Sequence, residues 1–136
     1  MPVVCVGSVK LEGPRWLLVL FRAEHGTIGK VRAFNEDCAI DAGGLPVIWL
    51  AGVGTRESLA ELAALAPAHE DALPAIAFHA DAEAGRVLEA LAAPAQNEKT
   101  RERALFWLGT ARGRAGFEIV RRFATTDPSD HTRVMA

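Results

Sequence analysis

The chain has 136 residues, of which 50% are hydrophobic and 24% are charged, and its formal net charge is −2. This is the size of one domain with a sizeable core, and the balance of apolar and charged residues excludes a wholly disordered chain. Its apolar runs fall short of the roughly 18–20 residues that cross a bilayer, so no membrane span is expected.

The first fifty residues carry the pattern of β-strands. Residues 3–9 are rich in β-branched side chains, residues 16–22 form a continuous apolar run, and residues 28–34 alternate between apolar and polar positions. A short apolar run follows at residues 46–50. Turn residues separate the four segments, and short connections favour antiparallel pairing. We therefore expect an N-terminal antiparallel β meander.

Two glycines, Gly52 and Gly54, lie between the last expected strand and the first expected helix. Dinucleotide-binding turns begin in this way. Here, however, Glu57 replaces the third glycine of that motif, and its carboxylate would repel a pyrophosphate at the helix N-terminus. No second parallel strand is expected, because the following residues have a helical pattern. We interpret the glycines as a corner before a helix that Thr55 caps.

From Thr55 onward the hydrophobic period changes from two to about 3.6 residues, which is typical of helices. The sequence therefore divides into a small β region, residues 1–53, and a helical region, residues 54–136. The breaks expected between helices fall at Pro67, Asp81, Pro94, Gly113 and Asp127-Pro128.

The helical region repeats itself with an offset of 32 residues. This offset pairs Leu73 with Leu105, Ile76 with Leu108, and Val87 with Ile119. Small residues recur as small and large apolar residues recur as large over two consecutive helices. Each unit is therefore expected to be a helix, a turn and a helix, with an apolar face that only a neighbouring unit can cover.

These units resemble bacterial HEAT-like repeats over roughly residues 68–136. In that family an Asp-Pro-Ser turn, here residues 127–129, opens the first helix, and an Arg-x-x-Ala motif, here Arg133 and Ala136, lies on its inner side. Arg101 and Ala104 match the same motif one unit earlier. The resemblance implies an α+β chain, in which the β meander precedes an α-solenoid of HEAT-like helical hairpins. The third repeat is truncated, so we expect either that the chain is a fragment or that its exposed repeat end meets a partner, which includes self-association.

The compartment is left open by the sequence. Residues 1–13 have neither the basic start nor the small-residue cleavage site of a signal peptide, which as written indicates a cytoplasmic protein. Residues 31–50, however, resemble the region that precedes such repeats in exported bacterial proteins, which implies a missing upstream signal peptide and a periplasmic or exported protein. Cys5 and Cys38 are two buried thiols in the first case, and a possible disulfide in the second.

The polar residues form no recognisable catalytic motif. The four histidines show no metal-binding spacing, and Ser58 and Ser129 have no recognisable base nearby and suit helix starts. We expect His69 and His79 at the surface or at helix ends, and Asp37 and Asp41 in turns. The sequence therefore predicts no catalytic, metal or cofactor site and a protein that is not an enzyme. An enzyme that uses residues missing upstream, or a HEAT-like lyase, is the third hypothesis and has only fold-level support.

Two sets of residues are candidates for binding a partner. Trp107 lies beside the apolar face of its helix, where it either packs in the core against the β region or anchors a partner protein. Residues 97–136 hold eight Lys/Arg against five Asp/Glu, an excess that an anionic partner could use. The arginines concerned are Arg112, Arg114, Arg121 and Arg122. The favoured function is a protein–protein interaction scaffold, and the alternative is nucleic-acid binding through the basic C-terminal half.

Overall fold

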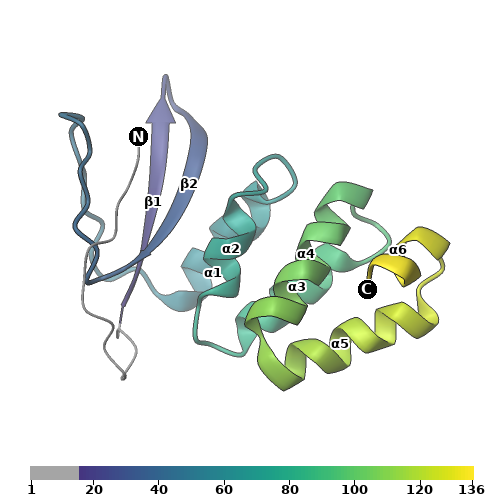
Figure 1. Ribbon diagram of the computed structural model, residues 1–136. Helices are drawn as coiled ribbons and strands as arrows, with labels where there is room; N and C mark the ends of the chain where they lie inside the picture. The colour runs from purple at the N-terminus through teal and green to yellow at the C-terminus, as the bar shows by residue number, and fades with distance from the viewer. Residues whose placement is uncertain (1–15) are drawn as a thin grey trace.

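The computed structural model describes residues 16–136, and in this range the chain is α+β. A two-stranded antiparallel hairpin comes first and helices follow it along the rest of the described chain (Figure 1). The elements are β1 (Leu17–Glu24), β2 (Thr27–Asn35), α1 (Thr55–Leu65), α2 (Ala72–Ala77), α3 (Glu83–Ala92), α4 (Glu98–Ala111), α5 (Gly113–Thr126) and α6 (Asp130–Met135). None of the helices in residues 16–136 is both long enough and apolar enough to span a bilayer.

The hairpin confirms the second and third expected strands. Val19 pairs with Ala33 and Phe21 pairs with Val31. His25 and Gly26 connect the strands, and both have positive φ, at 51° and 77°. Two left-handed residues are what a tight type I′ hairpin turn requires, and glycine adopts this conformation without a steric cost.

The prediction of a strand at residues 46–50 is wrong. These residues have no regular secondary structure, and their apolar side chains are exposed. A strand needs a neighbour for its backbone, and no described strand lies beside this segment, while Pro46 has no N–H to donate. The strand expected at residues 3–9 lies outside the described residues. Cys5 does too, so its pairing with Cys38 stays a prediction.

The helix boundaries follow the predicted breaks. Helices end before Pro67, Asp81 and Pro94, and the other two interruptions separate α4, α5 and α6. The start of α1 differs from the expectation in its capping residue. Gly54 occupies the N-cap and Thr55 is the first helical residue, with no side-chain capping hydrogen bond. Gly52 has a φ of 75°, so the glycines form a turn into a helix, and no strand precedes them.

The core lies among α1 to α4, and Val31 of β2 joins it. Val31 is fully buried, and its backbone N–H donates to the Asp71 carboxylate at 3.0 Å, which ties the hairpin to the residue before α2. Several of the positions that the 32-residue offset pairs have matching burial, although Leu88 is buried and its counterpart Val120 is only partly buried. Leu73 and Leu105 are both buried, Ile76 and Leu108 are both buried, and Val87 and Ile119 are both partly buried. Along the chain α2 packs on α4, α4 packs on α6, and α3 contacts α5.

Candidate partner-binding surface

Trp107 forms an aromatic cluster with Phe78 and Phe106. The Phe78 ring meets the Trp107 ring edge-on at 5.6 Å between centroids, and the Phe106 ring meets it at 5.3 Å. Such edge-to-face pairs stabilise aromatic clusters by about 0.5–1.5 kcal/mol beyond their buried area. Trp107 is partly buried against the core, whereas Phe78 and Phe106 are each 52% exposed. The cluster therefore consists of one ring packed against the core and two rings that are about half exposed.

The cluster spans two helices that are far apart in sequence. Phe78 is the C-cap residue of α2, and Trp107 and Phe106 belong to α4, which packs on α2. Trp107 is therefore partly packed against the core and against Phe78 at the end of α2, and its role as an anchor for a partner stays a prediction. Phe78 was missed as a site residue, since nothing in its local pattern indicates that α2 ends beside Trp107.

Arg112 fixes the backbone on which Phe78 is carried. Its guanidinium donates to the carbonyl oxygens of Ala77 at 3.3 Å and His79 at 2.6 Å, which are the residues on both sides of Phe78. It also donates to the Asp81 carbonyl at 2.8 Å. A cation at a helix C-terminus satisfies carbonyls that have no intrahelical partner. Arg112 thus positions the aromatic cluster from within the chain.

The other three arginines lie along α5. Arg121 pairs with Glu118 at 3.0 Å, and Arg122 pairs with Glu89 on α3. Arg114 is exposed, and none of its contacts within the described chain is a hydrogen bond or an ion pair. A phosphate would have to compete with the existing carboxylate partners of the first two. The structure does not assemble the four arginines into one open basic patch.

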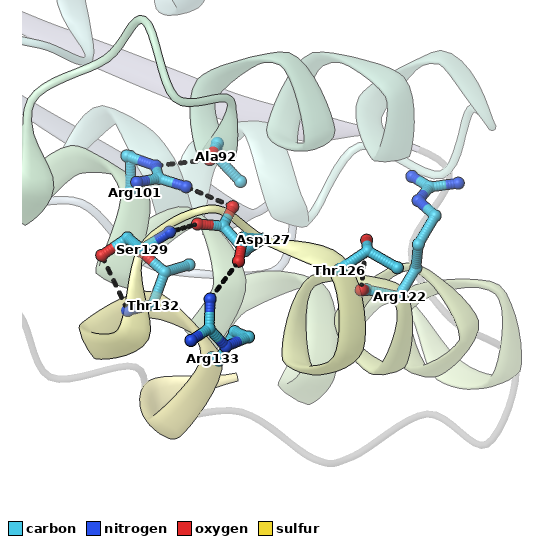
Figure 2. Close-up of polar contacts among 8 residues, drawn as sticks. All are labelled: Ala92, Arg101, Arg122, Thr126, Asp127, Ser129, Thr132 and Arg133. Atoms are coloured by element: carbon cyan, nitrogen blue, oxygen red, sulfur yellow. Dashed lines mark hydrogen bonds and ion pairs between the residues drawn. The ribbon is translucent and has the colours of Figure 1, made fainter.

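A buried ion pair connects the end of α5 to α4. The Arg101 guanidinium donates to the Asp127 carboxylate at 2.5 Å and to the Ala92 carbonyl at 2.8 Å, and both charged side chains are buried (Figure 2). The other Asp127 oxygen accepts from the Ser129 N–H at 2.9 Å, and the Arg133 guanidinium donates to the Asp127 carbonyl at 2.5 Å. This network holds the turn that opens α6.

Opposing effects set the pKa of the Asp127 carboxyl. Burial by itself raises this pKa, since a charged group is less stable away from water. The hydrogen bonds from Arg101 and the Ser129 N–H, with the charges of Arg101 and Arg133, lower it, and together they outweigh burial. The pKa of Asp127 is therefore below its ordinary value, and the carboxylate is charged at neutral pH.

One polar pair went unnoticed in the sequence. Ser58 lies in the first turn of α1, and its hydroxyl is 3.0 Å from Nε2 of His79. Nδ1 of His79 is 2.7 Å from the Ala75 carbonyl oxygen, which can only accept, so Nδ1 carries a proton, and in the neutral tautomer Nε2 accepts from the Ser58 hydroxyl. The expectation that Ser58 has no base nearby is wrong, and 21 intervening residues explain why no motif revealed it. His79 follows α2, as expected for a helix-end histidine, but is buried, so the pair fixes α1 against α2.

A polar pocket of about 410 Å³ lies between β2, the turn before α2 and the start of α4. Its charged groups already have partners. Arg32 pairs with Asp71 at 3.3 Å, and Lys99 pairs with Glu70 at 3.3 Å. In residues 16–136 no group of three His, Cys, Asp or Glu side chains is arranged to hold a metal ion. Comparison of the chain with models of protein families, with curated proteins and with solved structures gives no match.

Proposed function

We propose that this chain is a non-enzymatic protein-interaction module, in which a short β region precedes HEAT-like helical hairpins that present an aromatic surface to a partner protein. The observation that carries the proposal is the aromatic cluster of Phe78, Phe106 and Trp107. Interfaces are enriched in aromatic anchors that are packed at one side and open at the other. Two half-exposed rings on an indole fixed by the core have this arrangement.

The repeat architecture is supported by the equivalence of positions 32 residues apart. A hairpin of α2 and α3 corresponds to a hairpin of α4 and α5, and the paired apolar residues of the first helices, α2 and α4, are buried at the same places. In the second helices, Leu88 of α3 is buried, whereas its counterpart Val120 of α5 is partly buried. First helices of successive units are in contact, and so are the second helices. In a solenoid each unit covers its neighbour in this way and leaves its outer rim for binding. The aromatic cluster lies where the first helices of two units meet.

Site-specific photo-crosslinking tests the proposal. A photoreactive phenylalanine analogue at position 106 should give a discrete crosslinked protein in cells that produce the chain. The matched control is position 117 on α5, since Phe117 is 57% exposed, close to the 52% of Phe106, but has no aromatic neighbour within reach. Adducts at both positions alike, or at neither, would contradict a specific role of the cluster.

Nucleic-acid binding through Arg112, Arg114, Arg121 and Arg122 is the weaker proposal. The contacts of Arg112 with backbone carbonyls and of Arg122 with Glu89 leave fewer charges for phosphate. Filter binding of DNA and RNA at about 50 and 200 mM salt distinguishes the two functions, because phosphate contacts weaken steeply over this range. Retention that falls with salt would favour nucleic acid. Equally low retention of DNA and RNA at both salt concentrations would contradict nucleic-acid binding.

A further inference from the structure

The loop between β2 and α1 carries an exposed apolar stretch, residues 45–53, which we call the apolar segment. Ile48 is 85% exposed and Trp49 is 66% exposed, and four further apolar side chains are exposed with them: Leu45, Val47, Leu50 and Val53. In Figure 1 the loop is drawn on the opposite side of the hairpin from the helices. Contiguous apolar patches larger than about 300–600 Å² are rare on monomeric proteins, and they mark binding surfaces.

The Leu45 N–H donates to the Ala42 carbonyl at 3.2 Å, but the backbone of the rest of this segment, residues 46–53, has no hydrogen bond in residues 16–136. Residues 45–51 of the segment have the length and the apolar character of a strand, and they lie between the left-handed residues Gly44, with a φ of 81°, and Gly52, with a φ of 75°. Exposed donors and acceptors on an extended apolar segment are a template for pairing with another strand.

We propose that the apolar segment pairs with the same segment of a second copy of this chain, as an antiparallel two-stranded ladder. Residues 42–55 contain no charged side chain, so antiparallel self-pairing brings no like charges together. A two-fold arrangement of this kind is the commonest symmetry of homo-oligomers. The inference concerns a surface separate from the aromatic cluster and does not depend on it.

The chemistry of the segment favours a strand over a lipid surface. A bilayer cannot satisfy the exposed backbone N–H and C=O groups, whereas a second strand satisfies them. The acidic residues Asp37 and Asp41 precede the segment closely, and an anionic membrane would repel them. Trp49 exposes about two thirds of its surface, and aromatic side chains bury about 150–250 Å² each, so this residue is the largest apolar contributor to the pairing.

Pro46 determines which edge of the segment can donate backbone hydrogen bonds to a second strand. Its nitrogen has no hydrogen, so the ladder forms on the opposite edge, where Val47 and Trp49 direct their N–H groups. A two-fold axis at Ile48 then places Val47 opposite Trp49 of the second copy. That is a β-branched residue facing an aromatic one, a favourable cross-strand pair.

Proline substitutions at adjacent positions test this register with the full 136-residue chain. Val47→Pro removes an N–H that faces the second copy, whereas Ile48→Pro removes one that faces solvent, and both replace a β-branched side chain. Sedimentation equilibrium from about 1 µM to about 1 mM spans weak to moderate association. We expect a dimer for the wild type, a dimer for I48P with at most a few-fold weaker affinity, and a loss of at least tenfold in affinity for V47P.

Amide exchange measured by NMR gives a second readout that holds even if V47P fails to fold. In the concentrated wild-type chain, exchange should slow at Val47 and Trp49 and stay fast at Ile48 and Leu50. A wild type that stays monomeric over the whole range would overturn the proposal. So would equal weakening by the two prolines, equal slowing at all four amides, or a monomer that instead binds phosphatidylcholine–phosphatidylserine vesicles.

Discussion

Asn97 and Ser129, which lie 32 residues apart, cap α4 and α6 in the same way. The Asn97 side-chain oxygen accepts from the Thr100 N–H at 2.9 Å, and the Ser129 hydroxyl accepts from the Thr132 N–H at 3.3 Å. Both threonines are buried, so each cap lies at the edge of the core. Side-chain caps satisfy backbone donors that the first helical turn leaves unpaired. The repetition therefore includes the polar contacts that start each unit as well as its apolar positions.

The close approach of α4 and α5 depends on Gly116. A Cβ at this position would overlap the Leu108 carbonyl oxygen and lie 2.7 Å from the Cβ of Arg112. Gly116→Ala should therefore destabilise the fold by about 1–3 kcal/mol, the cost of overpacking, as measured by urea denaturation. Gly109→Ala is the control, since a Cβ there meets only Val120 at an ordinary 3.8 Å. It should stabilise α4 by about 0.5–1 kcal/mol, so equal effects of the two substitutions would argue against this packing.

The buried pair of Arg101 and Asp127 makes a second prediction. Arg101→Ala leaves the carboxylate buried without its main partner, which should cost about 3–5 kcal/mol of unfolding free energy. The control is Arg86→Ala on α3, because Arg86 pairs with Glu83 at 2.8 Å in an exposed position. Exposed pairs contribute less than about 1 kcal/mol. A loss from Arg101→Ala as small as that from the control would show that the pair is solvated.

The lowered pKa of Asp127 gives this pair a pH dependence of known sign. In the unfolded chain the Asp127 carboxyl has a pKa of about 3.9. The pKa of Asp127 in the folded chain lies below its ordinary value. The stability that the ionised carboxylate contributes is therefore fully present above the pKa of the unfolded chain, and it is lost as the pH falls through the pKa of the folded chain. Denaturation across acidic pH should show a decline in wild type that is smaller in Asp127→Asn. A decline of the same size in both would assign the acid sensitivity to other carboxylates.

The sequence predicts the helical part of this chain better than the β part, for a physical reason. Helix limits depend on residues nearby, such as Pro67 and Gly113, and the burial of Ile76 and Leu108 follows from a periodic apolar face. Residues 46–50 have a strand-like composition, but a strand also needs a partner that the local sequence does not supply. The HEAT-like assignment stays a prediction, supported by the repeated contacts.

The candidate site was predictable only in part, because its contacts join distant residues. Trp107 is recognisable as a large aromatic on an apolar helix face, but its contact with Phe78 arises only when α2 and α4 pack together. Arg112 is recognisable as a cation, yet its carbonyl partners lie more than thirty residues earlier. The contact of Ser58 with His79 likewise depends on how α1 meets α2. Tertiary packing decides each of these roles.

The docking of α6 on α4 should weaken as pH rises. His131 on α6 forms a hydrogen bond with the Glu102 carboxylate of α4, and its Nε2 atom lies 3.8 Å from Oε1 of Glu98. The hydrogen bond to Glu102 raises the pKa of His131, partial desolvation lowers it, and the charges of Glu98 and Glu102 raise it further, so it lies above the ordinary value. Because the pKa of His131 is raised in the folded chain, the stability that its protonated ring contributes is complete below the pKa of the unfolded chain, about 6.5. This contribution is lost as the pH rises through the pKa of the folded chain.

NMR titration of the His131 ring checks this second pH dependence. The midpoint should lie above about 6.5 in wild type and fall in Glu102→Gln, which removes the negative charge but keeps a hydrogen-bonding oxygen. Amide exchange in α6 should accelerate over the same pH interval, and that acceleration should be smaller in Glu102→Gln. A midpoint unaffected by Glu102→Gln would mean that the ion pair does not form in solution.

Leu108 tests the apolar face that the two units share. Its side chain is fully buried in α4, and it corresponds to Ile76 of α2 across the 32-residue offset. Leu108→Ala should cost about 2–5 kcal/mol in urea denaturation, since it removes buried methyl groups and leaves a cavity. The control is Val134→Ala, because Val134 is 84% exposed on α6 and lies outside the apolar segment, and its loss should change stability by less than about 0.5 kcal/mol. A loss below about 0.5 kcal/mol for Leu108 as well would contradict the register of the repeat, because a fully buried leucine cannot be truncated without leaving a cavity.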